Sequence, residues 1–374
     1  MNGKLRNMTD LFKDRFNYDS LNKLASEIQT VYHEFSAEAF LKSVMDESWD
    51  RLEFKQRVMQ IACNLGKYLP ADYKTAIAVI DQVITNYDVC QDGFAVFFPA
   101  FVELYGQDNE NWDVSMEALE RYTPYASAEF AVRAFIIKDE KRMMAQMADW
   151  AGHDNEHVRR LASEGCRPRL PWGQALPEFQ KDPSPVLVIL EQLKEDSSPY
   201  VRKSVANNLN DISKTHPDLV VKIARDWYGK NENTDWIVRH GCRTLLKNGS
   251  QDVLGLFGFA DADCVKVSGF SLETTELFIG EDLVFCFEIA AAKETKVRLE
   301  YGIDYVKANG RRNRKIFQIS EITLKENGKK TYTKKHSFAD TSTRKHYPGI
   351  HSVTLIVNGA ARGTLEFEVR FRVY

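Results

Sequence analysis

The sequence predicts a helical-repeat solenoid followed by an immunoglobulin-like β-sandwich. Two observations carry this prediction: the period of the apolar residues changes near residue 260, and a loose repeat of Val-Arg pairs precedes that change. The chain has 374 residues, of which 44% are hydrophobic and 11% aromatic, so it can bury two cores of ordinary size. We therefore expect a helical domain over residues 1–260 and a β domain over residues 264–374.

The helical half is predicted from the spacing of its apolar residues. They recur three or four positions apart, as at Leu21, Leu24 and Ile28, and the pattern continues to about residue 258. Turn signals interrupt the pattern at short intervals, which indicates many helices of moderate length. The clearest signals are LPAD at 69–72, DPSP at 182–185, THPD at 215–218 and KNGS at 247–250.

Four Val-Arg pairs form a faint internal repeat, each expected near the start of a helix. The last two intervals, 43 and 37 residues, are close to the length of a HEAT-type helix pair. A stack of such pairs makes a curved solenoid with one concave wall. Acidic or polar residues precede the last three pairs, where they can cap a helix and pair with the arginine, so a structural role is the simplest interpretation of each arginine. The pairs lie at 132–133, 158–159, 201–202 and 238–239.

Beyond residue 264 the period changes to two, which is typical of strands. About seven short strands in roughly 110 residues suit an immunoglobulin-like sandwich. Three Asn-Gly dipeptides, at 309–310, 327–328 and 358–359, can supply the positive φ angles that tight hairpins require. Cys286 has no cysteine in a later strand to pair with, so no inter-sheet disulfide is expected. The alternating segments are 283–289, 315–324, 352–357 and 364–374.

The net charge of −3 and the pI of about 6.3 conceal an uneven distribution of charge. Residues 1–260 hold 31 Lys+Arg against 38 Asp+Glu, and the remainder holds 19 against 15. Residues 307–345 carry twelve basic residues and three acidic ones. The β domain is therefore expected to suit an anionic partner.

Cysteine use and hydropathy predict a soluble, cytoplasmic protein. The six cysteines are scattered without a C-x-x-C pair, which favours reduced thiols. The first residues include no apolar core of signal-peptide length, and no stretch approaches the roughly 18 apolar residues of a membrane span.

Common metal and nucleotide motifs are missing from the sequence. His153 and His157 stand four residues apart in HDNEH. The Glu of an H-E-x-x-H zinc motif is absent from the second position, so we do not expect a metal site there. The sequence has no phosphate-binding loop, dinucleotide-binding glycine pattern or nucleophile elbow, which disfavours nucleotide hydrolysis and acyl transfer.

The stretch HVRRLASEGCRPRLPW, residues 157–172, combines four arginines with one glutamate. In a helix, Arg160, Glu164 and Arg167 share one face at i, i+4 and i+7. The prolines that follow would end the helix and project Trp172. An ordinary ion pair on a packed or solvated face explains this spacing as well as a ligand site does.

A second helical line favours the ligand site. Lys203, Asn207 and Asp211 place a cation, an amide and a carboxylate at i, i+4 and i+8. Two neighbouring helices would then direct cations toward an anionic ligand and carboxylates toward a positive group.

At these residues the sequence resembles the AlkC-type DNA glycosylases, HEAT-like repeat enzymes that remove small cationic alkylated bases such as 3-methyladenine. The resemblance covers nearly all of the helical half, and SEGCRPRLPW and SVANNLNDISK are its specific motifs. A branch of the family also carries a C-terminal immunoglobulin-like domain. His33 departs from the family pattern, in which a proline follows VY. Weaker matches occur at 41–80, 127–136 and 239–249.

The resemblance implies that a carboxylate stabilises the cationic base and the oxocarbenium-like sugar, and positions the attacking water. By motif position Glu164 is expected nearest the lesion, with Glu129 and Asp211 as further catalytic candidates. Trp172 is expected to contact the cationic base, or the gap beside it, through a cation–π interaction. No metal and no redox cofactor is implied, because the methylated base is already a good leaving group. Bent DNA, rather than a deep pocket, is expected to expose the lesion.

Arginines around these carboxylates are expected to hold the phosphates that flank the lesion. The basic loops at 309–315 and 327–335 are expected to grip the duplex, unless they are ordinary solvated hairpins. The implied partner is double-stranded DNA containing alkylated bases, bound by a monomer that has no membrane contact and is nucleoid-associated through DNA. The expected DNA-binding residues are Arg160, Arg167, Arg169, Arg202, Lys203, Arg239, Arg243, Arg311, Arg312, Arg314 and Lys315.

Two other functions remain compatible with the sequence. A non-enzymatic HEAT-repeat scaffold for a protein partner predicts an apolar concave wall, whereas this chain is expected to line the wall with arginine and carboxylate. A DNA-binding protein without catalysis is not distinguished by the sequence, because carboxylates do not by themselves prove turnover.

Overall fold

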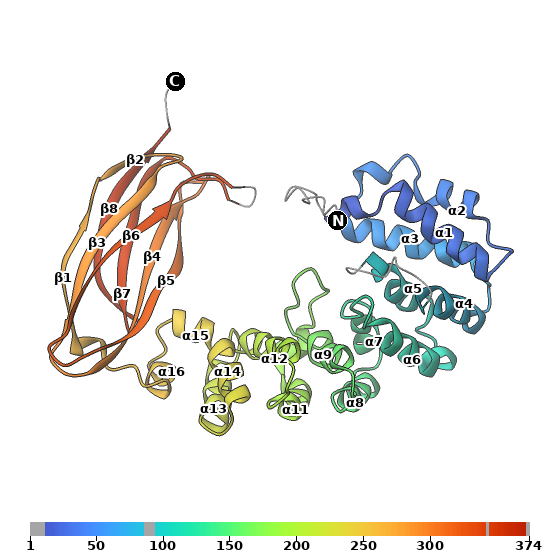
Figure 1. The fold of residues 1–374 in the computed structure, drawn as a ribbon, viewed down its shortest axis with the longest axis horizontal. Coiled ribbons are helices and arrows are strands. Elements are labelled where there is room, and N and C mark those ends of the chain that lie inside the picture. Colours follow the sequence, from blue (N-terminus) through green and yellow to red (C-terminus); the bar gives the residue numbers. More distant parts are fainter. Residues whose placement is uncertain (1–11, 86–93, 342–343, 372–374) are drawn as a thin grey trace, which may run out of the picture. The chain divides into compact units, whose positions relative to one another are not determined.

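The computed structural model describes residues 12–85, 94–341 and 344–371 (Figure 1). The chain forms two compact units, which are taken one at a time below. We call Met1–Thr215 with Tyr228–Gly241 the helical unit, and His216–Trp227 with Cys242–Tyr374 the mixed unit.

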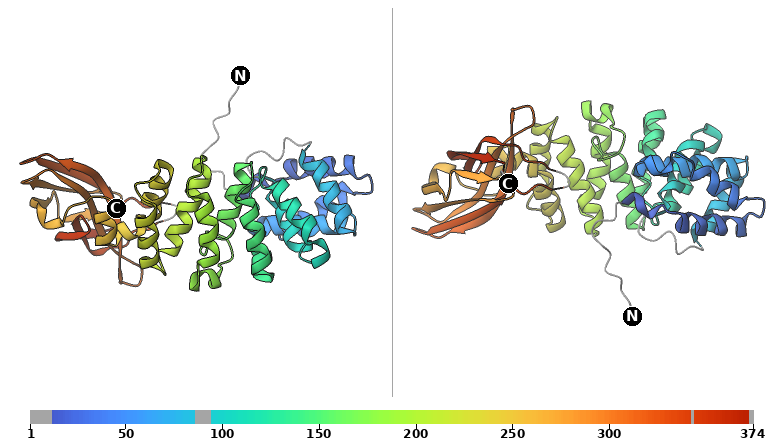
Figure 2. Two further views of the ribbon diagram at one scale, coloured as in Figure 1. Left: turned by 90° about the horizontal axis from the view of Figure 1, so that it is seen from below. Right: turned by 90° about the horizontal axis from the view of Figure 1, so that it is seen from above.

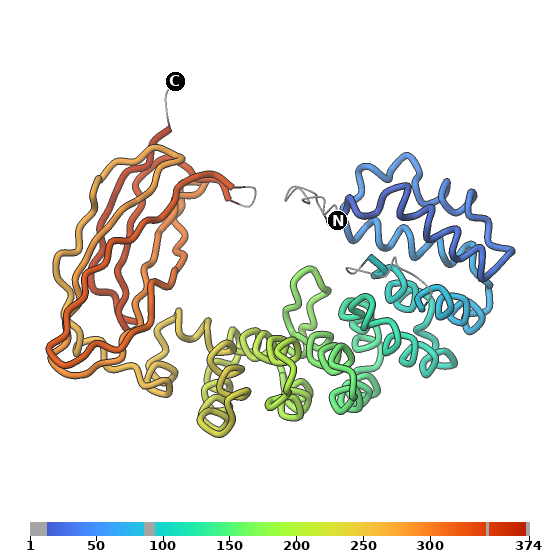
Figure 3. Tube along the Cα trace, in the orientation of Figure 1, coloured from blue at the N-terminus to red at the C-terminus, as the bar shows by residue number. Residues whose placement is uncertain are grey.

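The helical unit consists of α-helices that pack mainly against their neighbours in the chain (Figures 1 and 2). They are α1 (Tyr18–Val31), α2 (Ala37–Val44), α3 (Phe54–Tyr68), α4 (Tyr73–Thr85), α5 (Phe97–Tyr105), α6 (Trp112–Tyr122), α7 (Val132–Lys138), α8 (Glu140–Trp150), α9 (Glu156–Gly165), α10 (Pro177–Lys181), α11 (Ser184–Leu193), α12 (Pro199–Ile212) and α14 (Glu232–Gly241). In the second half of the unit, α9, α12 and α14 pack side by side in one layer, and α8 and α11 lie against them in another. The trace in Figure 3 alternates between these two layers from α8 to α12. This is the helical-repeat arrangement that the sequence predicts.

Polar side chains cap the helices that carry the second and third Val-Arg pairs. Asn155 caps α9 and Ser198 caps α12, each by accepting a hydrogen bond from the backbone N–H two residues on, at 2.8 and 3.2 Å. Val158 and Val201 are each the third residue of their helix, and both are buried. The predicted helix starts at these two pairs are confirmed.

The fourth Val-Arg pair is not near a helix start, so this prediction is wrong. It lies in the last turn of α14, which begins at Glu232. The helix starts early because the Asn231 side chain accepts a hydrogen bond from the Asn233 N–H at 2.8 Å, as an N-cap does. Arg239 therefore occupies the C-terminal turn, where the helix dipole favours a cation.

The mixed unit joins short helices to a β-sandwich. Its helices are α13 (Pro217–Trp227), α15 (Arg243–Lys247) and α16 (Gln251–Leu256), and its strands are β1 (Val265–Leu272), β2 (Glu276–Phe278), β3 (Asp282–Ala291), β4 (Thr295–Val306), β5 (Arg312–Leu324), β6 (Lys329–Ser337), β7 (Gly349–Val357) and β8 (Ala360–Arg370). One sheet has the order β1-β3-β6 and the other β2-β8-β7-β4-β5. All pairs are antiparallel except β2 with β8. The predicted sandwich is confirmed, with eight described strands rather than about seven.

The inward side chains of the strands form the core of the sandwich. On β3, Leu283, Phe285 and Phe287 alternate with more exposed residues and are buried. This alternation is the period of two that the sequence shows, and it packs the two sheets face to face.

Two of the three Asn-Gly dipeptides serve the predicted hairpins. Asn358 and Gly359 form the two-residue turn between β7 and β8, with φ angles of 45° and 80°, and Gly310 has a φ of 74° in the β4–β5 loop. Asn327 has the expected positive φ, 55°, but the third hairpin is wrong, because residues 327–328 connect β5 to β6, which lie in different sheets. β6 instead pairs with β3 along its whole length and completes the three-stranded sheet.

Helix gives way to strand between α16 and β1, around the predicted division at residues 260–264. The mixed unit extends further toward the N-terminus, since Asn358 Nδ2 donates to the Ala260 carbonyl and Lys296 Nζ to the Phe257 carbonyl, each at 2.7 Å. Independent folding of residues 1–260 and 264–374 therefore stays a prediction.

Cysteines and hydropathy give two further facts about the described residues. Cys63, Cys166, Cys242, Cys264 and Cys286 are free thiols. Within the same residues, no helix has the length and apolar character to cross a bilayer.

Candidate active site

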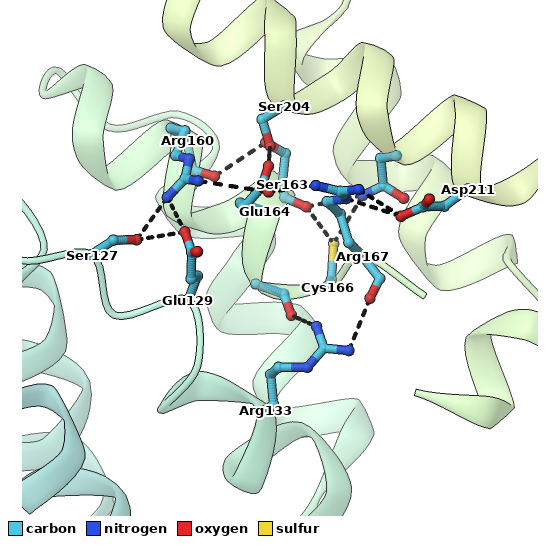
Figure 4. A network of polar contacts seen from close by, with 12 residues as sticks. Ser127, Glu129, Arg133, Arg160, Ser163, Glu164, Cys166, Arg167, Ser204 and Asp211 are labelled. Atoms are coloured by element: carbon cyan, nitrogen blue, oxygen red, sulfur yellow. Dashed lines mark hydrogen bonds and ion pairs between the residues drawn. The ribbon is translucent and has the colours of Figure 1, made fainter. Parts of the chain in front are cut away.

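A network of charged side chains connects α9, α12 and the turn before α7 (Figure 4). α9 and α12 pack closely where both helices carry small polar residues, and Ser163 Oγ donates to Ser204 Oγ at 2.6 Å across the contact. Gly165 gives α9 its close approach to α7, since a Cβ there would lie 2.5 Å from a methyl group of Val132. The motif SEGCR thus places its glutamate and arginine against the neighbouring helix.

Arg167 is the buried centre of this network, with 7% of the residue exposed. Its Nη1 donates to Glu164 Oε1 at 2.6 Å, and its Nε donates to Asp211 Oδ2 at 3.0 Å. Burial alone would lower the pKa of Arg167, but the two carboxylates together raise it above the ordinary value. The guanidinium is therefore charged and fully committed to two carboxylates, and its burial argues against the expected phosphate contact.

Glu164 and Asp211 are also buried, with 5% and 2% of each residue exposed. Glu164 Oε2 accepts from Ser204 Oγ at 2.6 Å, and its Oε1 lies 3.6 Å from Arg160 as well as accepting from Arg167. Asp211 Oδ1 accepts from Lys214 Nζ at 3.0 Å. Every oxygen of these two carboxylates is thus engaged within the protein.

Glu129 differs from the other two carboxylates. It lies in the turn before α7 and its side chain is 16% exposed. Its Oε2 accepts from Ser127 Oγ at 2.8 Å and from Arg160 Nη1. Its Oε1 accepts no hydrogen bond from any residue that the structure describes, so among these three carboxylates it is the oxygen most open to a ligand.

Arg160 joins the exposed carboxylate to the buried network. Its guanidinium contacts Glu129 on one side and Glu164 on the other, and it lies 5.1 Å from the centre of the Tyr200 ring. Through these contacts the Arg160 side chain orients Glu129. A direct phosphate contact would require Arg160 to share its remaining donors.

Arg133 supports the same site through the backbone, a role that the sequence does not reveal. It is 1% exposed and donates to the carbonyls of Gly165 and Arg167, at 2.8 and 3.0 Å, and also to that of Gln174. Burial lowers its pKa to about 10. In the sequence, the one available signal of this role is that Arg133 belongs to the first Val-Arg pair. Through these hydrogen bonds Arg133 holds both ends of the loop that carries Trp172.

Trp172 projects from this loop with 73% of the residue exposed. Its φ of 62° is in the left-handed region, which a tryptophan adopts only where its surroundings hold it. Lys55 Nζ donates to the Trp172 carbonyl, and the Phe54 ring lies 6.4 Å from the indole. The indole is therefore presented to solvent from an anchored backbone.

The other cationic side chains that we expect to bind DNA differ in their exposure and in their partners within the protein. Arg169 and Lys203 are exposed. Arg202 donates to the carbonyls of residues 196 and 197, at 2.8 and 2.7 Å, so it fastens the turn before α12. Arg239 and Arg243 are half-buried, in α14 of the helical unit and α15 of the mixed unit.

The four basic residues of the β4–β5 loop and β5 also differ from one another. Arg311 and Lys315 are exposed. Arg312 Nη1 lies 3.1 Å from Glu366, and Arg314 forms a two-point ion pair with Asp304 at 2.9 and 2.7 Å. The bond from Arg314 is the main reason that the pKa of Asp304 is lowered.

The two histidines of HDNEH have separate partners. His153 Nδ1 accepts from the Asn155 N–H at 2.9 Å, whereas the His157 ring packs on Tyr200. Among residues 12–85, 94–341 and 344–371, no cluster of three His, Cys, Asp or Glu side chains could hold a metal ion.

Comparisons with known proteins place this geometry in a family. The family described as "DNA alkylation repair enzyme" matches residues 107–245, and the family described as "Uncharacterised protein YhaZ, C-terminal Ig-like domain" matches residues 266–371. The chain is 44% identical over 362 residues to the uncharacterized protein YhaZ of Bacillus subtilis (strain 168), across 97% of this chain and 100% of that protein. The structure of the Pseudomonas fluorescens alkylpurine DNA glycosylase AlkC, bound to DNA containing an abasic site analog, superposes with a TM-score of 0.91 and 38% identity, across 96% of this chain and 99% of that chain. The chain therefore belongs to the DNA alkylation repair enzyme family, in the AlkC-type branch that carries a C-terminal immunoglobulin-like domain.

Proposed function

We propose that this protein is a DNA glycosylase that releases small cationic alkylated bases, chiefly 3-methyladenine, from duplex DNA without a metal ion. The family and the similarity to AlkC support glycosylase activity. The observation that carries the proposal for this chain is Glu129, a partly exposed carboxylate that Ser127 and Arg160 hold through Oε2 and whose Oε1 accepts no hydrogen bond within the described residues.

The chemistry suits a fixed carboxylate. When the bond between C1′ and the base nitrogen breaks, its electron pair leaves with the base, which becomes neutral, and the sugar becomes an oxocarbenium-like cation. Water then adds to C1′ and loses a proton, which leaves an abasic site. A carboxylate beside C1′ attracts both the cationic base and the sugar cation and can accept the proton from water.

The buried network gives that carboxylate its fixed orientation. Arg167 holds Glu164, Glu164 lies beside Arg160, and Arg160 holds Glu129. A group that is already oriented before the reaction needs no rearrangement as charge develops. We therefore assign Glu129 to the reacting atoms, and Glu164 and Asp211 to the support of the site.

The exposed side chains near the network are proposed to hold the DNA. The indole of Trp172 offers a cation–π contact to the alkylated base or to the gap beside it. Arg169 and Lys203 are the exposed cations of the two motifs and are proposed to bind the flanking phosphates.

The basic residues of the β domain give a prediction about salt. Changing Arg311, Arg312, Arg314 and Lys315 together to glutamine should weaken duplex binding and flatten the slope of log affinity against log salt, by about 0.9 for each phosphate that the variant no longer neutralises. Arg312 and Arg314 already pair with carboxylates. Changing only Arg311 and Lys315 should therefore weaken duplex binding and flatten the salt slope more than changing only Arg312 and Arg314. Fluorescence anisotropy across a salt series measures the slope. An unchanged slope in the fourfold variant would remove the β domain from the DNA-binding surface.

The proposed activity is tested by incubating the full-length protein, in EDTA, with methylated duplex DNA and identifying the released bases by mass spectrometry. We expect free 3-methyladenine and an equal amount of alkali-labile abasic sites. Tight binding of DNA without base release would favour a DNA-binding protein without catalysis. Neither binding nor release would favour a scaffold for a protein partner.

A further inference from the structure

Trp172 occupies a position in a turn that normally favours glycine. The Gly173 N–H donates to the Leu170 carbonyl at 3.1 Å, and Trp172 is the third residue of this turn, with a φ of 62°. Pro171 is the second residue, and a proline followed by a positive φ is the pattern of a type II turn, whose third position favours glycine or asparagine. A tryptophan there is strained, and such strain persists only where the surroundings hold it. The strain points to a functional role for the side chain that the turn directs.

Lys55, in the first turn of α3, holds the strained peptide group. Its Nζ donates to the Trp172 carbonyl at 2.5 Å, and the two residues are 117 positions apart in the sequence. That carbonyl belongs to the same peptide group as the Gly173 N–H, so one polar group of the peptide is held by the turn and the other by Lys55. Because a peptide group is planar, fixing its carbonyl also fixes ψ of Trp172. Lys55 therefore helps to set the direction of the indole.

Phe54, the residue before Lys55, supports the indole itself. The two rings lie 6.4 Å apart, with an angle of 47° between their planes. Phe54 in turn stacks on Phe16 at 5.6 Å, and Phe16 is buried. The start of α3 thus contacts both the backbone and the side chain of Trp172.

Lys55 also contacts the turn that carries Glu129. Its Nζ lies 4.8 Å from the centre of the ring of Phe130, the residue directly after Glu129, where the face of the ring attracts a cation. An opening of about 410 Å³ lies between α3, α5 and this turn, so close packing does not fix the turn against α3 there. The Lys55 side chain spans the opening and connects the loop of Trp172 to the turn of Glu129.

The groups around the Lys55 ammonium favour this position. Glu103 of α5 lines the same opening. Burial raises the pKa of Glu103 to about 7, and the positive charge of Lys55 acts in the opposite direction, so the two groups lie within electrostatic reach. A carbonyl, an aromatic ring and a carboxyl group thus all attract the ammonium. Lys55 is itself exposed, so replacing it removes these contacts without leaving a cavity in the core.

We propose that Lys55 is a positioning residue that fixes the indole of Trp172 relative to Glu129 before DNA binds. This inference rests on the proposed function and extends it by naming the residue that sets the geometry between the lesion contact and the carboxylate. An indole that is already oriented loses little freedom when the lesion arrives, and a displacement of about 1 Å in such a site can cost about a hundredfold in rate. Lys55 acts through Trp172 and Phe130 and does not touch the reacting atoms.

The first experiment uses the full-length protein without DNA. Protein labelled with 5-fluorotryptophan gives fluorine NMR signals, and the signal of Trp172 is the one that disappears in Trp172→Phe. We expect one narrow Trp172 signal in the wild type and a shifted, broadened signal in Lys55→Met, because the peptide loses the group that holds its carbonyl. Lys55→Arg should restore the wild-type signal, since a guanidinium can donate to the same carbonyl.

Lys67→Met is the matched control for these spectra. Lys67 is an exposed lysine of the same helix, and its Nζ donates to Asn64 Oδ1 at 3.1 Å. Its replacement should leave the Trp172 signal in place. An unchanged Trp172 signal in Lys55→Met overturns the proposal.

The second experiment measures release of 3-methyladenine under single-turnover conditions. Lys55→Met should slow release about tenfold, because the indole is no longer held in its productive orientation, and Lys55→Arg should recover most of the rate. The Tm and the affinity for a duplex containing tetrahydrofuran should stay close to those of the wild type. Lower affinity with a flatter salt slope would make Lys55 a phosphate ligand instead, and a lower Tm with an unchanged rate of the folded protein would make it a purely structural residue.

A double-mutant cycle tests whether Lys55 acts through Trp172. Trp172→Ala removes the indole, so adding Lys55→Met to that variant should slow release by no more than about a further twofold. Equal losses from Lys55→Met in the presence and absence of the indole would mean that the two residues act independently, and the positioning role would be wrong.

Failure of the proposed function has a different signature. If the wild type releases no base, the glycosylase activity is wrong, and the fluorine spectra still decide whether Lys55 fixes the indole. If the wild type releases base and Lys55→Met matches it in rate and spectrum, only the positioning role is wrong.

Discussion

Glu129→Gln is expected to slow single-turnover release of 3-methyladenine by about two orders of magnitude or more, with little change in DNA affinity. The substitution keeps the size of the side chain and removes its charge. A hundredfold loss corresponds to about 2.7 kcal/mol, which is below the roughly 4 kcal/mol that two unit charges 4 Å apart exchange near a protein surface. Loss of one preoriented electrostatic group has this scale in other enzymes.

Stability separates this effect from damage to the fold. Glu129 is partly exposed and one of its oxygens accepts no hydrogen bond within the described residues, so Glu129→Gln should leave the Tm nearly unchanged. Glu117→Gln is a matched control, because Glu117 is an exposed carboxylate paired with Arg121 on α6. Release at the wild-type rate by a well-folded Glu129→Gln protein would exclude Glu129 from catalysis.

Glu164→Gln should behave differently, although motif position led us to expect Glu164 nearest the lesion. Both of its oxygens are occupied in the buried network, and a glutamine there would weaken the ion pair with Arg167. We expect a lower Tm together with slower release, because the orientation of Arg160 and Glu129 depends on this network. A variant with a normal Tm and a large loss of activity would return the reacting role to Glu164.

Arg167→Met is expected to destabilise the helical unit by about 3–5 kcal/mol, the usual result of breaking a buried ion pair from one side. The methionine fills much of the space and leaves Glu164 and Asp211 buried without their shared cation. For a unit of this size the change corresponds to a fall in Tm of about 10 °C. Urea unfolding followed by circular dichroism measures the free energy.

Arg169→Met is the control for this prediction. It removes an arginine two residues further along the same motif, where the side chain is exposed. We expect a change within about 0.5 kcal/mol. A similarly small change in Arg167→Met would show that the buried network contributes little to stability.

Periodicity was sufficient to predict the architecture from the sequence. Apolar residues such as Val158 and Val201 recur at helical spacing and are buried against neighbouring helices, and Leu283 and Phe285 alternate on β3. These patterns depend on local geometry, which each segment carries in its own residues. The hairpin predicted at Asn327-Gly328 is wrong because the packing of the whole sandwich decides which strands pair. A turn dipeptide does not specify that the two strands it connects pair with each other.

The sequence predicted which residues make up the candidate site, but it did not predict which of them remain exposed. Spacing predicted Arg160, Glu164 and Arg167 on one face of a single helix. α9 ends at Gly165, so Arg167 lies just beyond it, but both arginine side chains still meet Glu164. Which carboxylate remains accessible depends on how α12 packs over that face, and this packing buries Glu164 while leaving Glu129 partly exposed.

The most direct test of the proposed electrostatic role uses DNA that cannot react. Duplexes containing a positively charged pyrrolidine in place of the damaged nucleoside mimic the sugar cation, and duplexes containing neutral tetrahydrofuran have nearly the same shape. If Glu129 stabilises the sugar cation through Oε1, the wild type should bind the charged duplex at least tenfold more tightly, since an enzyme binds an analogue of its transition state more tightly than a neutral one. Glu129→Gln should erase that preference. Equal affinity of the wild type for both duplexes would contradict the proposed mechanism.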